Sequence, residues 1–174
     1  MDNTSLFFLI FGLSKQSNFL DYLMIFGAEL LIYLTFILIF FLAFKESVPE
    51  RKALLLSLIS MPIIVILIKL IHIFIVTPRP FVQNEILPLV NLHSDASFPS
   101  RHTSIMSAIA FSYVFTKSKF VLLFILLMLW VGISRIYVGV HYPLDIIGGI
   151  LVGFASILIA RKIAKILGRK LSIS

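Results

Sequence analysis

A histidine and a carboxylate in the second half of the chain have the types and the spacing that phosphoryl transfer needs. His141 and Asp145 are four residues apart, and Pro143 between them is typical of a helix start. A carboxylate at the third helical position can reach back toward a side chain that precedes the helix, as a capping-box acid does. Asp145 can therefore hold one imidazole nitrogen of His141 and leave the other free as a nucleophile.

Arginines and a second histidine supply the remaining parts of such a site. The segment 99–102, Pro-Ser-Arg-His, opens a predicted helix, where free N–H groups and the helix dipole favour an anion. The planar donors of Arg79 and Arg135 match phosphate oxygens. His102 can donate a proton. These parts indicate phosphoryl transfer in which positive side chains take the place of Mg²⁺.

The composition determines where such a site can lie. The 174 residues are 60% hydrophobic and 13% charged, with a mean hydropathy of +1.08, whereas soluble domains carry about 25% charged residues. A soluble domain and a nucleic-acid partner are therefore poor interpretations of the net charge of +7. The chain has no cysteine, which excludes thiolate metal sites and thiol nucleophiles.

The apolar segments predict an all-α integral membrane protein. It forms one domain over residues 1–174, with its motifs in residues 69–145. A short N-terminal segment, Leu6 to Leu13, is too short to span and is expected to form an interfacial or half-inserted helix. The oligomeric state is left open. The bundle of about five transmembrane helices is predicted at residues 19–44, 52–76, 101–116, 119–139 and 143–167.

Basic residues indicate the orientation of this bundle. With five spans, ten of the fifteen basic residues fall on one face, which the positive-inside rule makes cytoplasmic together with the C-terminus. The histidines and the remaining basic residues apart from Lys15 map to the outer ends of the spans, which predicts an extracytoplasmic site in the cytoplasmic membrane. His93 has no motif around it and is interpreted as part of a solvated loop.

Three motifs resemble those of the type 2 phosphatidic acid phosphatases, which share their site with the vanadium haloperoxidases. That family's pattern is Lys-x6-Arg-Pro, then Pro-Ser-x-His, then Ser-Arg-x5-His-x3-Asp. In this chain the motifs begin at His72, Pro99 and Ser134, in the same order, and the last motif is complete. The resemblance covers residues 72 to 145.

The resemblance implies a role for each matching residue. His141 would attack phosphorus, Asp145 would orient it, and His102 would protonate the leaving oxygen. Water would then hydrolyse a phosphohistidine intermediate, with no cofactor and no metal ion. The implied phosphate ligands are Arg79, Ser100 and Arg135.

Two positions depart from the family pattern. The usual lysine is His72, so either His72 donates to the phosphate or Lys69, one turn earlier, supplies the charge; a shared role with Lys69 as the cation is favoured. The usual glycine between serine and histidine is Arg101, which could narrow the pocket, contact a second phosphate or headgroup, or extend to lipid headgroups.

The resemblance is greatest to bacterial undecaprenyl-diphosphatases within this family. It implies a membrane lipid substrate, undecaprenyl diphosphate, that is hydrolysed to undecaprenyl phosphate. Phosphatidylglycerophosphate phosphatases and lipid A phosphatases would use the same residues and remain alternatives. From another functional class, a non-catalytic lipid-phosphate binder or transporter is expected to lack the nucleophile or its carboxylate, and both are present as His141 and Asp145.

Overall fold

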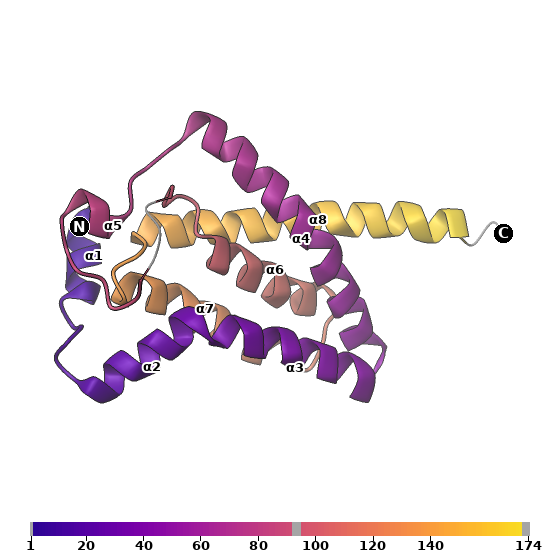
Figure 1. The fold of residues 1–174 in the computed structure, drawn as a ribbon. Helices are drawn as coiled ribbons and strands as arrows, with labels where there is room; N and C mark the ends of the chain where they lie inside the picture. Colours follow the sequence, from indigo (N-terminus) through magenta and orange to yellow (C-terminus); the bar gives the residue numbers. More distant parts are fainter. Residues whose placement is uncertain (1, 92–94, 172–174) are drawn as a thin grey trace.

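The chain forms a bundle of helices in a computed structural model that describes residues 2–91 and 95–171 (Figure 1). His93 lies outside the described residues. The part of the chain that is described contains eight helices and no strand. The helices are α1 (Asn3–Phe11), α2 (Asn18–Glu29), α3 (Leu31–Lys45), α4 (Val48–Phe74), α5 (Pro80–Gln83), α6 (Arg101–Phe115), α7 (Val121–Tyr137) and α8 (Pro143–Leu171).

The predicted all-α membrane bundle is confirmed, with a helix or a bent helix pair at each of the five apolar segments. Helices α4 and α8 are each long and apolar enough to cross a membrane. Helices α2 and α3 pass the same test only as a pair, because the chain bends by 57° at Leu30 between them. Helix α7 is apolar throughout but has 17 residues.

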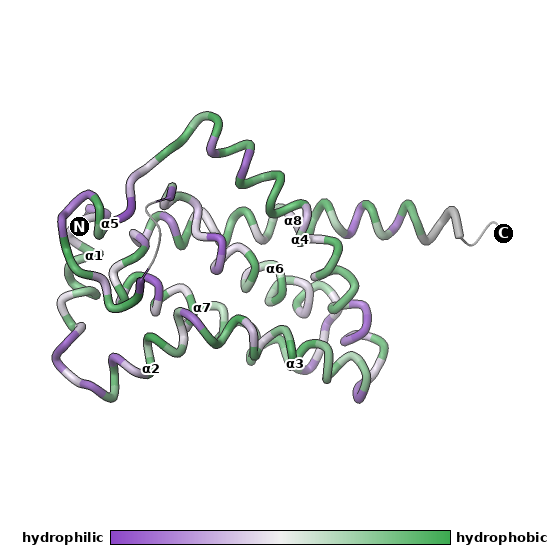
Figure 2. The backbone as a smooth tube through the Cα atoms, in the orientation of Figure 1, coloured by the Kyte–Doolittle hydropathy of each residue, from purple (hydrophilic) through white to green (hydrophobic). Residues whose placement is uncertain are grey.

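Large apolar side chains cover the outside of the bundle. Phe44 and Phe74, for example, are 82% and 85% exposed. Hydrophobic residues dominate the middle of the helices, whereas hydrophilic residues gather at the turns (Figure 2). A soluble protein rarely exposes so much apolar surface, so this exterior suits contact with lipid tails.

Helix α6 lies in the middle of the bundle and packs against α4, α7 and α8. Its approach to α8 depends on glycine. A Cβ atom at Gly149 would lie 2.8 Å from the carbonyl oxygen of Ser100, and one at Gly153 would lie 2.5 Å from that of Ser104. Small residues let helix backbones approach closely within a membrane. The amino-terminal ends of α6 and α8 therefore meet, and Ser100 N–H donates to the carbonyl oxygen of Asp145 at 3.0 Å.

The short helix α1 packs against the start of α8. The Asn3 side chain accepts a hydrogen bond from Leu144 N–H at 3.0 Å, and Phe7 is fully buried, with its ring centroid 5.2 Å from that of Tyr142. With nine residues, α1 is too short to span, as predicted.

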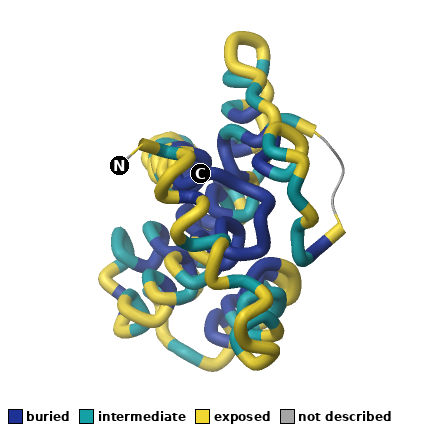
Figure 3. The backbone as a smooth tube through the Cα atoms, turned by 90° about the vertical axis from the view of Figure 1, so that its left-hand side faces the viewer, coloured by how far each residue is buried: buried dark blue, intermediate teal, exposed yellow. Residues whose placement is uncertain are grey.

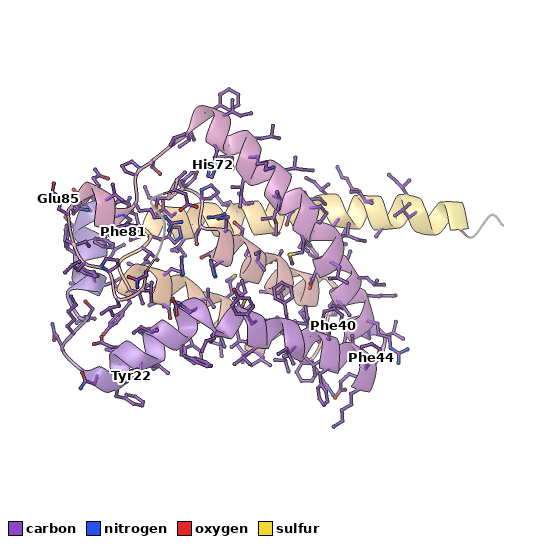
Figure 4. All side chains as sticks on the ribbon, in the orientation of Figure 1. Tyr22, Phe40, Phe44, His72, Phe81 and Glu85 are labelled. Carbon is purple, nitrogen blue, oxygen red and sulfur yellow. The ribbon has the colours of Figure 1, made fainter. Side chains whose placement is uncertain are left out.

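The motif residues all belong to one end of the bundle. Helices α4 and α7 end there, α6 and α8 begin there, and the last residues of α8 lie at the opposite end (Figure 1). Viewed from the motif end, buried backbone occupies the centre and exposed turns surround it (Figure 3). His72, Phe81 and Glu85 share this end, whereas Phe40 and Phe44 mark the other (Figure 4).

Candidate active site

His141 lies in the loop between α7 and α8 and is 2% exposed. Its Nδ1 atom is 3.3 Å from Oδ2 of Asp145. The same carboxylate oxygen accepts a hydrogen bond from Tyr142 N–H at 2.8 Å, which is the reach back from the helix start that the sequence predicts. Asp145 thus fixes the ring through one nitrogen and leaves Nε2 pointing elsewhere.

A hydroxyl group that the motifs do not include completes this arrangement. Ser97 is fully buried, donates to Oδ2 of Asp145 and lies 3.4 Å from Nδ1 of His141. A backbone hydrogen bond fixes the position of Ser97, because its N–H donates to the carbonyl oxygen of Thr77 at 2.9 Å.

The loop that carries His141 folds back on the end of α7. The carbonyl oxygen of Arg135 accepts from the N–H groups of both Val140 and His141, each at 3.2 Å. Gly139 makes this turn with a φ of +88°, in the left-handed region that favours glycine. A Cβ atom there would also lie 2.8 Å from the Phe11 ring. The short loop therefore fixes His141 beside the last turn of α7.

Arg79 reaches the free side of the His141 ring. Its Nη1 atom lies 3.3 Å from Nε2 of His141 and donates to the carbonyl oxygen of Val140 at 3.1 Å. Arg79 is 2% exposed and precedes the short helix α5. The guanidinium group of the first motif and the imidazole ring of the third motif therefore lie side by side.

Arg135 carries a donor with no partner. Its Nη1 atom donates to the carbonyl oxygen of Ala28 at 3.2 Å. Its Nε atom is buried and is one of only two buried side-chain polar atoms without a hydrogen bond among the residues that the structure describes. An unpaired buried donor is costly and suits an anion that arrives with the substrate.

The start of α6 contributes Ser100 and His102. Ser100 is the fully buried N-cap residue, and its hydroxyl oxygen accepts from Thr103 Oγ1 at 3.1 Å. His102 is half-buried and lines a cavity of about 360 Å³ together with Arg135, Glu29 and Asn91. The second and third motifs thus share one cavity.

Lys69, His72 and Arg101 line a neighbouring cavity of about 320 Å³ between α4 and α6. His72 uses its Nε2 atom to contact the carbonyl oxygen of Phe98 at 3.0 Å. Asp95 lines the same cavity and binds both Arg79 and Arg101. Asp95 is a second residue that sequence reasoning missed, because it lies in a polar stretch without a motif.

The environment of His141 keeps its ring neutral. Burial lowers the pKa of His141 to about 4; the hydrogen bond to Asp145 opposes this shift, and the charges of Arg135 and Arg79 add to it. A neutral ring has the lone pair that a nucleophile needs. Within residues 2–91 and 95–171, no group of three or more histidine, aspartate or glutamate side chains could hold a metal ion.

A membrane helix bundle with a buried histidine, its carboxylate and nearby arginines fits a membrane phosphatase. The PAP2 superfamily model matches residues 50–169, and the chain belongs to this family. This confirms the predicted family and, with it, a lipid phosphatase.

Named relatives agree with this assignment, and solved structures agree with the fold. The undecaprenyl-diphosphatase BcrC of Bacillus subtilis is 33% identical over 150 residues, which cover 86% of this chain and 78% of the relative. The crystal structure of Aquifex aeolicus LpxE has a TM-score of 0.73 and 26% identity, and the match covers 92% of this chain and 94% of that one. A PAP2-type phosphatidylglycerolphosphate phosphatase from Bacillus subtilis has a TM-score of 0.60 at 21% identity, covering 93% and 86%.

Proposed function

We propose that this chain hydrolyses undecaprenyl diphosphate to undecaprenyl phosphate and inorganic phosphate. The observation that carries the proposal is the buried ring of His141, whose Nδ1 atom faces Asp145 and whose Nε2 atom faces Arg79. The similarity to BcrC, a relative named as an undecaprenyl-diphosphatase, supports this choice of substrate. The reaction takes place at the outer face of the cytoplasmic membrane.

In the first step Nε2 of His141 attacks the terminal phosphorus, and the bond from phosphorus to the bridging oxygen breaks. His102 gives its proton to that oxygen as undecaprenyl phosphate leaves. Arg79, Arg135 and Ser100 bind the terminal phosphate, because charged donors in a buried site stabilise the charge that develops on the transferred group. The unpartnered Nε atom of Arg135 supports this assignment.

In the second step water attacks the phosphohistidine. His102, now neutral, takes a proton from the water as the P–N bond breaks and the electron pair returns to Nε2. Inorganic phosphate then leaves, and His102 is protonated again for the next cycle. Asp145 keeps the ring in one tautomer and orientation throughout, and Ser97 holds the carboxylate.

Lys69 and Arg101 add positive charge beside the site, and His72 lines the same cavity. We assign the cationic role of the usual lysine to Lys69, because the Nε2 atom of His72 contacts the Phe98 carbonyl oxygen. Arg101 is assigned to a second phosphate. The neighbouring cavity that these three side chains line supports the assignment.

The orientation is supported by basic residues at the end of the bundle that is remote from the site. Arg51, Lys52 and Lys119 lie at that end, near the junctions of α3 with α4 and of α6 with α7. By the positive-inside rule, this end faces the cytoplasm, together with the C-terminus.

A phosphate-release assay in detergent tests the function. The substrates are undecaprenyl diphosphate, phosphatidylglycerophosphate, phosphatidic acid and lipid A, each with EDTA present. Undecaprenyl diphosphate should have the highest kcat/KM, and His141→Ala should abolish its turnover while the protein remains folded. A higher kcat/KM for lipid A or phosphatidylglycerophosphate would mean that this lipid, and not undecaprenyl diphosphate, is the substrate. Absence of turnover on all four would favour a lipid-phosphate binder.

A further inference from the structure

Asp95 bridges two arginines at the mouth of the site. Oδ1 accepts from Nε and Nη2 of Arg79 at 2.9 and 2.8 Å, and Oδ2 accepts from Nη2 of Arg101. The side chain of Asp95 is 43% exposed, whereas that of Arg79 is 3% exposed. One carboxylate therefore joins a buried arginine to an exposed one.

Arg79 has two edges that serve different partners. Nη1 points toward Nε2 of His141 and the carbonyl oxygen of Val140. Nε and Nη2 point toward Asp95. A guanidinium fork of this kind binds a carboxylate and a phosphate in the same way. An anion in the place of Asp95 would therefore lie one guanidinium group away from the nucleophile.

The charge of Asp95 suits a carboxylate that another anion can displace from the two arginines. Partial burial raises the pKa of Asp95, but the hydrogen bond from Arg79 and the charges of Arg79 and Arg101 outweigh this effect, so the pKa lies below its usual value. The group is thus an anion at neutral pH. Because its carboxylate is partly exposed, it can give up its bonds to the two arginines and be solvated by water when a phosphate with a larger negative charge binds to them.

We propose that Asp95 occupies the subsite of the substrate's inner phosphate, between Arg79 and Arg101. A diphosphate displaces the carboxylate, because its terminal phosphate binds at His141 and its inner phosphate takes the two arginines. A monophosphate binds with Asp95 in place and is repelled by it. Asp95 and Arg101 thereby favour diphosphates over monophosphates, including the two products. This inference rests on the proposed function.

The residues around Asp95 suit an inner phosphate that displaces its carboxylate. The cavity of about 320 Å³ beside Asp95 is also lined by Lys69, which offers a further donor to an inner phosphate. Ile64 and Ile68 line the same cavity and add apolar surface from α4. The subsite thus combines a cationic region with an apolar wall, as a lipid diphosphate requires.

The test compares farnesyl diphosphate with farnesyl monophosphate, whose tails are identical. Arg101→Gln should reduce kcat/KM by about 10- to 100-fold for the diphosphate and by less than about threefold for the monophosphate. Asp95→Asn should raise kcat/KM for the monophosphate about fivefold and should tighten inhibition by orthophosphate and vanadate by a similar factor. Glu46→Gln is the matched control, since Glu46 forms an exposed ion pair with Lys119 remote from the site. This variant should leave every value unchanged.

Two results would overturn the inference. If Asp95→Asn weakens vanadate inhibition and lowers kcat/KM for both substrates alike, Asp95 only positions Arg79. If Arg101→Gln affects both substrates equally, Arg101 does not bind the inner phosphate. Melting temperatures of the empty variants identify any loss of folding.

Calorimetry with inorganic pyrophosphate and orthophosphate separates this inference from the proposed function. Arg101→Gln should weaken binding of pyrophosphate at least about tenfold and leave that of orthophosphate unchanged. If the wild-type protein hydrolyses neither farnesyl substrate but this difference persists, the proposed function fails and the subsite stands. Equal affinity changes for the two anions would reject the subsite whatever the turnover.

Discussion

The Nη1 atom of Arg79 lies 3.3 Å from the Nε2 atom of His141, although the two residues are 62 positions apart in the chain. A permanent cation next to a buried imidazole disfavours a second positive charge on the ring. The contact therefore adds to the effect of burial in keeping the ring neutral, and it leaves a cation beside Nε2 where the proposed phosphate would bind.

The carboxylate behind His141 should matter for rate far more than for folding. In Asp145→Asn the amide oxygen can still accept from Tyr142 N–H, so the start of α8 is retained. The charge that stabilises a positively charged His141 is lost, and kcat should fall by about 10²- to 10⁴-fold. Phosphate release and the melting temperature measure the two effects. A variant with normal kcat would show that Asp145 does not orient His141.

Arg135 should contribute to anion affinity through its Nε atom. Arg135→Lys keeps a positive charge but removes this donor, so inhibition by vanadate should weaken by about 10- to 100-fold. Without ligand, the melting temperature should stay the same or rise, because the empty site holds an unpaired buried donor. Vanadate inhibition and thermal unfolding test both statements. Unchanged inhibition together with a large loss of stability would indicate a purely structural arginine.

The contact between α6 and α8 should tolerate no added side chain at Gly149. In Gly149→Ala the new Cβ atom would lie 2.8 Å from the carbonyl oxygen of Ser100, so unfolding free energy should drop by about 1–3 kcal/mol. Activity should fall as well, because Ser100 and Asp145 meet there. Leu151→Ala, at an exposed position on α8, should change stability by less than about 0.5 kcal/mol. Equal effects in the two variants would contradict the close packing of the helices.

The pH dependence should report the neutral state of His141. Its pKa is lowered from 6.5 to about 4, so the acidic limb of kcat/KM that belongs to this residue should lie well below pH 6.5. Between these two values the unfolded chain binds more protons than the folded one, and stability should therefore decrease as pH falls through this range. His141→Gln should remove that part of the slope. If the acidic limb of kcat/KM lies near pH 6.5 with several substrates, this result would be inconsistent with a buried neutral ring.

The motifs predicted that His141 lies beside Asp145 and that the motif residues lie at one end of the bundle, because each motif adjoins a helix end. The family pattern did not contain Ser97 or Asp95, which lie in the irregular segment before α6. Serine and aspartate are ordinary residues in such a segment. Only the folded chain brings Ser97 to Asp145 and Asp95 to Arg79.

The break in the first span was also beyond prediction from sequence. Residues 19–44 are a nearly continuous apolar stretch, yet the helix bends by 57° between α2 and α3. The last turn of a helix leaves carbonyl oxygens without partners, and Arg135 donates to one of them, at Ala28. The partner comes from α7, more than a hundred residues away, so no local pattern could indicate it.

A structure of the protein with vanadate bound would test the central claim most directly. The claim predicts vanadium bonded to Nε2 of His141 in a trigonal-bipyramidal geometry, with its oxygens bound by Arg79, Arg135 and Ser100. Vanadate bound elsewhere, or held by the arginines without a bond to His141, would contradict the account.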